Sequence, residues 1–222
     1  MITAKQVRVI DCSAEVPKDV TDVKTAKEEY IARHIPGALF LDLENLRDKS
    51  SPYPNMVPAP SQFKSHVQSL GIGLETPIVT YDTTDGKWAT RGAFLFKYYG
   101  HTNVRILDGG RAAWMHHFRH DETKMAKGES QPGNDKDFDY KPDPDLLTSY
   151  DQIQLLMKGK KPFQIVDGRP KEVFEKGNIP GSINVPMSKL ILDGFIQDKL
   201  QLNEIFRKAG VDTNHHLVFT CG

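Results

Sequence analysis

The chain has 222 residues, which is enough for one large domain or two modest ones, each able to bury a core of its own. Its 29 Lys and Arg residues balance its 29 Asp and Glu residues, so the formal net charge is zero. This balance argues against nucleic acid or a membrane surface as a partner. The first residues lack the apolar core of a signal peptide, and no stretch is apolar enough to cross a membrane. We expect a cytoplasmic or mitochondrial protein.

Short β-branched runs alternate with helical patterns along the first half of the chain. Strands are predicted over residues 7–10, 78–81 and 104–107, and helices over residues 61–70 and 90–99. The first of these helices is expected to begin at Ser61, a good N-cap residue that follows a proline. Strands that alternate with helices predict a parallel sheet with helices on both faces.

A polar stretch over residues 124–144 is rich in Lys, Asp, Gly and Pro. Such a composition is typical of a linker between domains. We therefore predict a first domain at residues 1–123, a linker at 124–145 and a second domain at 146–222.

The chain contains an internal repeat. In each copy an apolar strand ends at an aspartate, Asp11 or Asp167, and an Ile-Pro-Gly segment follows before a second apolar strand. When the two copies are aligned through these second strands, Asp82 of the first copy corresponds to Cys221 of the second. Only the second copy therefore offers a nucleophile.

Cys221 is the candidate catalytic residue, because a buried strand that delivers a cysteine and a glycine to a turn is how α/β enzymes present a thiolate. The alternative is a small buried hydrophobe at a strand end. Cys12 is expected to be a buried thiol, and two cysteines do not form a secreted disulfide framework. The adjacent histidines at 116–117 and 215–216 lack partners at ligand spacing, so no metal site is predicted.

Several motifs recur in a fixed order through both copies. They are HIPGA at residues 34–38, SPY at 51–53, LDGG at 107–110, VDGR at 166–169 and NIPGSINVP at 178–186. With these motifs the chain resembles the tandem rhodanese sulfurtransferases, which comprise the thiosulfate and 3-mercaptopyruvate sulfurtransferases. The resemblance implies an α/β fold of two rhodanese-like domains, each a mostly parallel sheet with helices on both faces. The first is inactive, and the second is catalytic and here incomplete.

The chemistry that the resemblance implies is transfer of a sulfane sulfur through a persulfide on Cys221, without a metal or an organic cofactor. The donor is a small molecule, 3-mercaptopyruvate or thiosulfate, and the acceptor is cyanide or a thiol such as thioredoxin or glutathione. Gly222, in the active loop, favours mercaptopyruvate, because members that prefer thiosulfate usually have arginine there. Arg169 is expected to contact substrate or to form a structural ion pair.

The sequence departs from the family pattern at positions that bind substrate. Val173 and Asn55 stand where the resemblance implies an arginine and a histidine. The first copy continues for 32 residues from Asp82 to Trp114, whereas one residue follows Cys221, so we expect a chain truncated in its second domain. These departures leave a catalytically dead binding or regulatory module as an alternative.

A phosphatase of the related cell-cycle type is a further alternative. Those enzymes place histidine before the cysteine, and Thr220 stands there in this chain. We therefore favour the sulfurtransferase.

Overall fold

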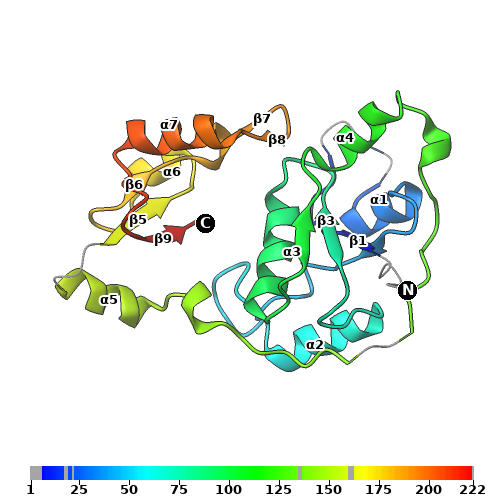
Figure 1. Ribbon diagram of the computed structural model, residues 1–222, viewed down its shortest axis with the longest axis horizontal. Coiled ribbons are helices and arrows are strands. Elements are labelled where there is room, and N and C mark those ends of the chain that lie inside the picture. Colours follow the sequence, from blue (N-terminus) through cyan, green and yellow to red (C-terminus); the bar gives the residue numbers. More distant parts are fainter. Residues whose placement is uncertain (1–6, 18–19, 22, 135–136, 160–162, 222) are drawn as a thin grey trace, which may run out of the picture. The chain divides into compact units, whose positions relative to one another are not determined.

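The computed structural model describes residues 7–17, 20–21, 23–134, 137–159 and 163–221. The chain divides into two compact units, Met1–Pro144 and Asp145–Gly222. Each unit has its own sheet and its own core (Figure 1). Among the described residues, no helix is both long enough and apolar enough to span a membrane.

The first unit is built on a four-stranded parallel sheet with the strand order β2-β1-β3-β4. Its strands are β1 Arg8–Asp11, β2 Leu39–Phe40, β3 Ile78–Tyr81 and β4 Val104–Ile106. Its helices are α1 Ala26–Ala32, α2 Pro60–Ser69, α3 Lys87–Tyr98 and α4 Gly110–His117, followed by a 3-10 turn, η1, at Glu122–Lys124. The three strands predicted in this half of the chain are present.

Helices cover both faces of this sheet, because side chains alternate between the faces along each strand. Ile10 and Ile78 lie in a core shared with apolar residues of α2 and α3, which are Phe63, Val67, Leu95 and Phe96. Tyr81 lies in a second, smaller cluster with Ile35 and Trp114 of α4. The predicted α/β arrangement is confirmed.

Two helices begin earlier than the sequence predicted. α2 begins at Pro60 and not at Ser61, because the fixed φ and the missing N–H of proline suit the first position of a helix. α3 begins at Lys87 and not at Thr90, because the carboxylate of Asp82 accepts hydrogen bonds from the backbone of its first turn. That carboxylate lies outside the helix and replaces a local side-chain cap.

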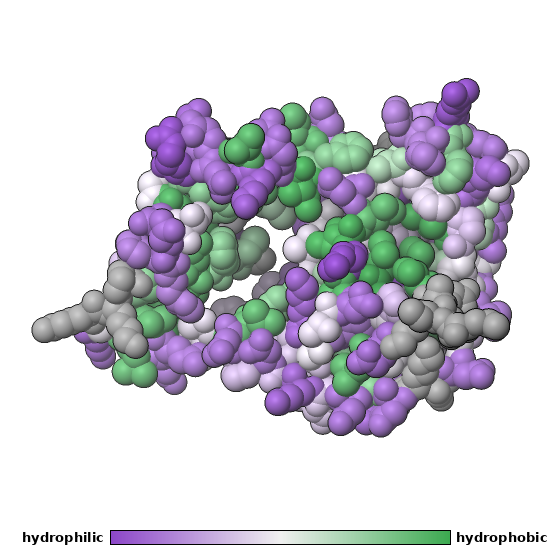
Figure 2. Space-filling model, in the orientation of Figure 1, coloured by the Kyte–Doolittle hydropathy of each residue, from purple (hydrophilic) through white to green (hydrophobic). Residues whose placement is uncertain are grey.

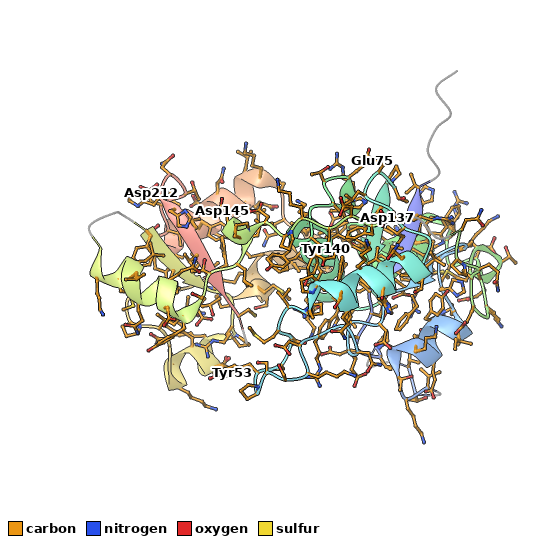
Figure 3. The ribbon with its side chains drawn as sticks, turned by 90° about the horizontal axis from the view of Figure 1, so that it is seen from below. Tyr53, Glu75, Asp137, Tyr140, Asp145 and Asp212 are labelled. Carbon is orange, nitrogen blue, oxygen red and sulfur yellow. The ribbon has the colours of Figure 1, made fainter. Side chains whose placement is uncertain are left out.

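Described residues of the segment 124–144, which falls in the predicted linker 124–145, instead pack on the first unit. Phe138 is fully buried in the main core, and Tyr140 packs against the same core. Asp137 forms an ion pair with Lys64 of α2, with 3.0 Å between Nζ and Oδ1. Figure 3 labels Asp137 and Tyr140 on the side of the first unit that carries α2. The polar composition of the segment concealed aromatic side chains whose burial fixes it in place.

The second unit contains a three-stranded parallel sheet with the order β6-β5-β9 and an antiparallel hairpin formed by β7 and β8. Its strands are β5 Phe163–Asp167, β6 Ile183–Asn184, β7 Ile191–Leu192, β8 Phe195–Ile196 and β9 His216–Thr220. Its helices are α5 Tyr150–Lys158, α6 Lys171–Lys176 and α7 Lys199–Ala209, with a 3-10 turn η3 at Met187–Lys189; a further 3-10 turn, η2 at Pro144–Leu146, spans the boundary between the units.

Two helices supply the cores of the second unit. α7 packs Ile205 and Phe206 into a cluster with Val166 of β5. α5 packs Ile153 into a separate cluster with Val218 of β9. The outward side of α7 is mostly hydrophilic, as Figure 2 shows, although Leu200 is 80% exposed there; a mostly polar outer side is typical of an amphipathic helix that lies on a sheet.

Strands β1 and β3 of the first sheet pair in the same register as β5 and β9 of the second, but the two sheets differ in what covers β3 and β9. Thr80 of β3 lies opposite Ile10, and Phe219 of β9 lies opposite Val166 at the equivalent place. Thr80 is fully buried beneath α3 and beside β4, whereas Phe219 is 64% exposed. Within the described part of the second unit, no helix or strand covers Phe219 as α3 and β4 cover Thr80.

Candidate active site

The candidate nucleophile lies at the carboxyl edge of the second sheet. Asp167 and Thr220 pair in register, and the N–H of Gly168 donates to the carbonyl of Thr220 at 2.8 Å. Cys221 follows directly, and its thiol is free and exposed. The alternative of a buried hydrophobe at this position is therefore wrong. Gly222, the predicted loop residue, lies outside the described residues.

Arg169 forms the structural ion pair that was one of its two predicted roles. Its Nε donates to both oxygens of Asp167 at 3.0 Å, and its Nη2 donates to one of them at 2.7 Å. The same Nη2 also donates to the carbonyl of Gly177 at 2.8 Å. Burial works to raise the pKa of Asp167, but hydrogen bonds from Arg169 and its charge outweigh burial, so that this pKa is lowered. The carboxylate therefore stays ionised and fixes the turn after β5.

The equivalent aspartate of the first unit behaves in the opposite way. Asp11 is also fully buried, but Ser13 occupies the place that Arg169 has in the second unit. Burial raises the pKa of Asp11, and the hydrogen bonds from Ser13 and Tyr81 do not fully offset this. At this position, therefore, the copy that carries the nucleophile has an arginine, and the other copy has a serine.

Cys221 and Arg169 line one pocket of about 740 Å³ that lies wholly within the second unit. Its other walls come from α5, from β5 and β9, and from the turn at residues 177–180. The pocket is open to solvent, and the exposed thiol lies in it next to the guanidinium of Arg169, so a small substrate can reach the thiol there.

The first unit shows what occupies the place of the nucleophile there. Asp82 is 1% exposed, and its carboxylate accepts four backbone hydrogen bonds. Oδ1 accepts from Thr84 at 2.9 Å and Gly86 at 3.1 Å, and Oδ2 accepts from Trp88 at 3.0 Å and Ala89 at 2.9 Å. These amides form an anion cradle at the N-terminus of α3, and Asp82 fills it with its own side chain. The first unit therefore has no reactive group at this place.

Cys12 has the opposite character to Cys221. It is fully buried, and burial, together with the negative charges of Asp11 and Asp82, raises the pKa of its thiol well above the usual value. A thiol that resists ionisation is a poor nucleophile. The prediction that Cys12 is a buried thiol is confirmed.

No group of three or more His, Cys, Asp or Glu side chains among the described residues is arranged to hold a metal ion.

Two features, one in each unit, were missed by sequence reasoning. The amide cradle around Asp82 was signalled only by the run Thr-Thr-Asp-Gly at residues 83–86, which is rich in turn-forming residues. The α5 wall of the Cys221 pocket was signalled by a capping box, in which Ser149 and Gln152 bond each other's backbone. That signal marks the start of a helix but does not show what the helix faces.

The chain matches a family model described as the rhodanese-like domain over residues 3–117 and 149–222. It is 32% identical over 229 residues to 3-mercaptopyruvate sulfurtransferase of Homo sapiens, and this alignment covers 97% of the chain and 74% of the relative. It is 34% identical over 229 residues to thiosulfate sulfurtransferase of Bos taurus, covering 96% of the chain and 74% of the relative.

A solved structure has the same fold. It is SseA from Escherichia coli, described as having the rhodanese fold of 3-mercaptopyruvate sulfotransferases, and it superposes with a TM-score of 0.85 at 28% identity. The superposition covers 97% of this chain and 82% of that one.

Proposed function

Because this chain belongs to the rhodanese family and is an enzyme of its sulfurtransferase type, we propose that it transfers a sulfane sulfur through a persulfide on Cys221. The observation that carries the proposal is the exposed thiol of Cys221 at the carboxyl end of β9, at the place that a buried carboxylate occupies in the other copy.

In the loading step, the Cys221 thiolate attacks the transferable sulfur of the donor, which is the outer sulfur of thiosulfate or the thiol sulfur of 3-mercaptopyruvate. With thiosulfate the S–S bond breaks, its electron pair leaves on sulfite, and the transferred sulfur remains as a persulfide anion on Cys221. With 3-mercaptopyruvate the C–S bond breaks, and the carbon that keeps the electron pair takes a proton to give pyruvate. Neither route requires a redox partner or a cofactor. We keep 3-mercaptopyruvate as the expected donor, on the identity of Gly222.

In the discharge step, an acceptor removes the outer sulfur. Cyanide leaves as thiocyanate, and a thiolate leaves as its persulfide, so that Cys221 returns to its starting form. Thioredoxin and glutathione are the thiol acceptors that we expect. The ion pair of Asp167 and Arg169 supports both steps indirectly, because it fixes the turn whose Gly168 N–H holds the carbonyl before Cys221.

Two matched cysteine variants test the proposal. After incubation with 3-mercaptopyruvate or thiosulfate, mass spectrometry should find one added sulfur on the Cys221 peptide, and Cys221→Ser should abolish both this sulfur and thiocyanate formation. Cys12→Ala, which removes the buried thiol, should keep both. If no sulfur is loaded on the folded wild-type chain, the non-catalytic binding module becomes the better description. If Cys221→Ser keeps turnover, the nucleophile has been misassigned.

A further inference from the structure

The positive charge of the Cys221 pocket comes from Arg169, the one cationic residue among the described residues that line it. The side chain of Arg169 is 23% exposed, whereas that of Asp167, the acidic residue of the lining, is fully buried. A molecule that enters the pocket can therefore touch the guanidinium but not the carboxylate paired with it.

The ion pair uses only part of the Arg169 guanidinium. Nε and Nη2 donate to Asp167, and Nη2 also donates to the carbonyl of Gly177. The N–H groups of Nη1 have no acceptor among the described residues. Because the bonds to Asp167 and Gly177 hold the planar group in one orientation, Nη1 is a preorganised donor for an anion.

The other polar residues that line the pocket carry no charge. They are Thr148, Tyr150, Gln154, Asn178 and Thr220. Their hydroxyl and amide groups can bond the oxygens of any small polar molecule, charged or neutral. Arg169 alone adds a full positive charge to its hydrogen bonds, and bonds between a charged donor and a charged acceptor are the strong ones. Arg169 therefore determines how far the pocket prefers an anion to a neutral molecule of the same shape.

Arg169 is also close enough to the nucleophile for their charges to interact. Hydrogen bonds to Asp167 raise the pKa of Arg169 against a smaller effect of desolvation, and the charges of Asp167 and of an ionised Cys221 add to the rise. Both Arg169 and Cys221 line the same pocket. One small molecule can therefore contact the two groups together.

We propose that Nη1 of Arg169 binds the anionic group of the sulfur donor while Nε and Nη2 of the same guanidinium hold Asp167. This inference rests on the proposed function, because it brings the transferable sulfur of a bound donor to the Cys221 thiolate. The anionic group is the carboxylate of 3-mercaptopyruvate or the SO₃ group of thiosulfate, so the pocket takes small anionic donors as a class. The role falls to a residue other than position 173, where the resemblance implied an arginine and Val173 stands.

Alkylation of Cys221 tests this contact without sulfur transfer. Iodoacetate and iodoacetamide carry the same reactive carbon beside an anionic or a neutral group. The rate of modification of the Cys221 peptide is measured by mass spectrometry for each reagent and divided by its rate with N-acetylcysteinamide, a neutral thiol. We expect a corrected preference for iodoacetate of about tenfold to a hundredfold, as for a hydrogen bond to a charged group. A corrected ratio of one or less would overturn the proposal.

Three variants separate a contact with the anion from a structural role. Arg169→Gln removes the charge and should bring the corrected ratio close to one. Asp167→Asn breaks the same ion pair but keeps the guanidinium, so it should change both rates by a similar factor and keep the preference. Lys171→Gln removes a cation whose side chain is 72% exposed and does not line the pocket, and it should also keep the preference.

The pattern across the variants decides between the two roles. If Asp167→Asn loses the preference as fully as Arg169→Gln does, the ion pair only shapes the pocket and the proposal is wrong. If Lys171→Gln loses it, the preference reflects overall charge and the proposal is wrong. Should Arg169→Gln not fold, the wild type and the other two variants still give this answer.

Sulfur donors provide a second readout and separate this inference from the proposed function. For the wild type, kcat/KM with 3-mercaptopyruvate should exceed that with 3-mercaptopyruvamide, its neutral counterpart, and Arg169→Gln should reduce this ratio about tenfold or more. If Cys221 loads sulfur but shows no preference for iodoacetate, only the role of Arg169 is refuted. If iodoacetate is preferred but no sulfur is loaded, the anion contact stands and the persulfide on Cys221 is refuted.

Discussion

Replacing Asp82 with alanine tests how much the filled anion cradle stabilises the first unit. The carboxylate accepts hydrogen bonds from four backbone amides, and the bond from the N–H of Ala89 is the most buried of the four, so this donor loses its acceptor in the variant. Leaving one such donor unpaired costs about 1–3 kcal/mol. Losing the cap of α3 costs a further ~0.5–2 kcal/mol. Water can partly replace the other contacts, so we expect a total of about 2–4 kcal/mol.

Urea unfolding followed by tryptophan fluorescence measures this loss selectively. The two tryptophans of the chain, Trp88 and Trp114, both belong to the first unit. Asp85→Ala is the control, because Asp85 accepts only longer contacts of 3.3 and 3.4 Å, and it should change the free energy of unfolding by less than ~0.5 kcal/mol. If Asp82→Ala unfolds within that same margin of the wild type, the cradle does not hold α3 in place and the reasoning fails.

Two further substitutions probe the buried turn of the second unit and the packing of the first. Asp167→Asn should destabilise the second unit by about 1–3 kcal/mol near neutral pH, because it removes the charged hydrogen bonds to Arg169. The folded-state pKa of Asp167 is lowered, so its contribution is present above the unfolded value of about 3.9 and is lost as the pH falls through the folded value. Urea titrations read by pulsed hydrogen exchange on the β5 peptide should therefore show the difference at pH 7 and a much smaller one near pH 2. An equal difference at both pH values would contradict the ion pair as its source. In the first unit, Gly92→Ala should cost about 1–3 kcal/mol, since the new Cβ meets the sulfur of Cys12. Adding Cys12→Ala should restore most of that loss in the same fluorescence assay, and a double variant as unstable as Gly92→Ala alone would show that the clash lies elsewhere.

The strands and the family were predictable because their signals are local. The runs that end at Asp11 and Asp167 are short, apolar and bounded by polar residues, and both are strands in the structure. The rhodanese resemblance, which rests on ordered motifs in both copies, is confirmed by the family model and by the relatives.

The features that sequence reasoning missed depend on contacts between distant residues. The start of α3 is set by the carboxylate of Asp82, five residues before Lys87, so no cap signal next to the helix marks it. Phe138 sits in a polar stretch, and only the core that receives it shows that the stretch is not a linker. For Arg169 the sequence left two roles open, and the geometry places its guanidinium on Asp167. Whether it also contacts substrate stays a prediction.

The occupied cradle of the first unit has a further consequence, because its occupant is tethered. The carboxylate of Asp82 is covalently part of the chain. It therefore binds the four amides without the loss of translational entropy that a free anion would suffer, and it occupies the cradle permanently. A free anion could bind the four amides only by displacing the Asp82 carboxylate, which cannot diffuse away. The same tether makes turnover impossible, since an occupant that cannot leave cannot become a product. At this position the first unit therefore holds a permanent anion and offers no atom for transfer.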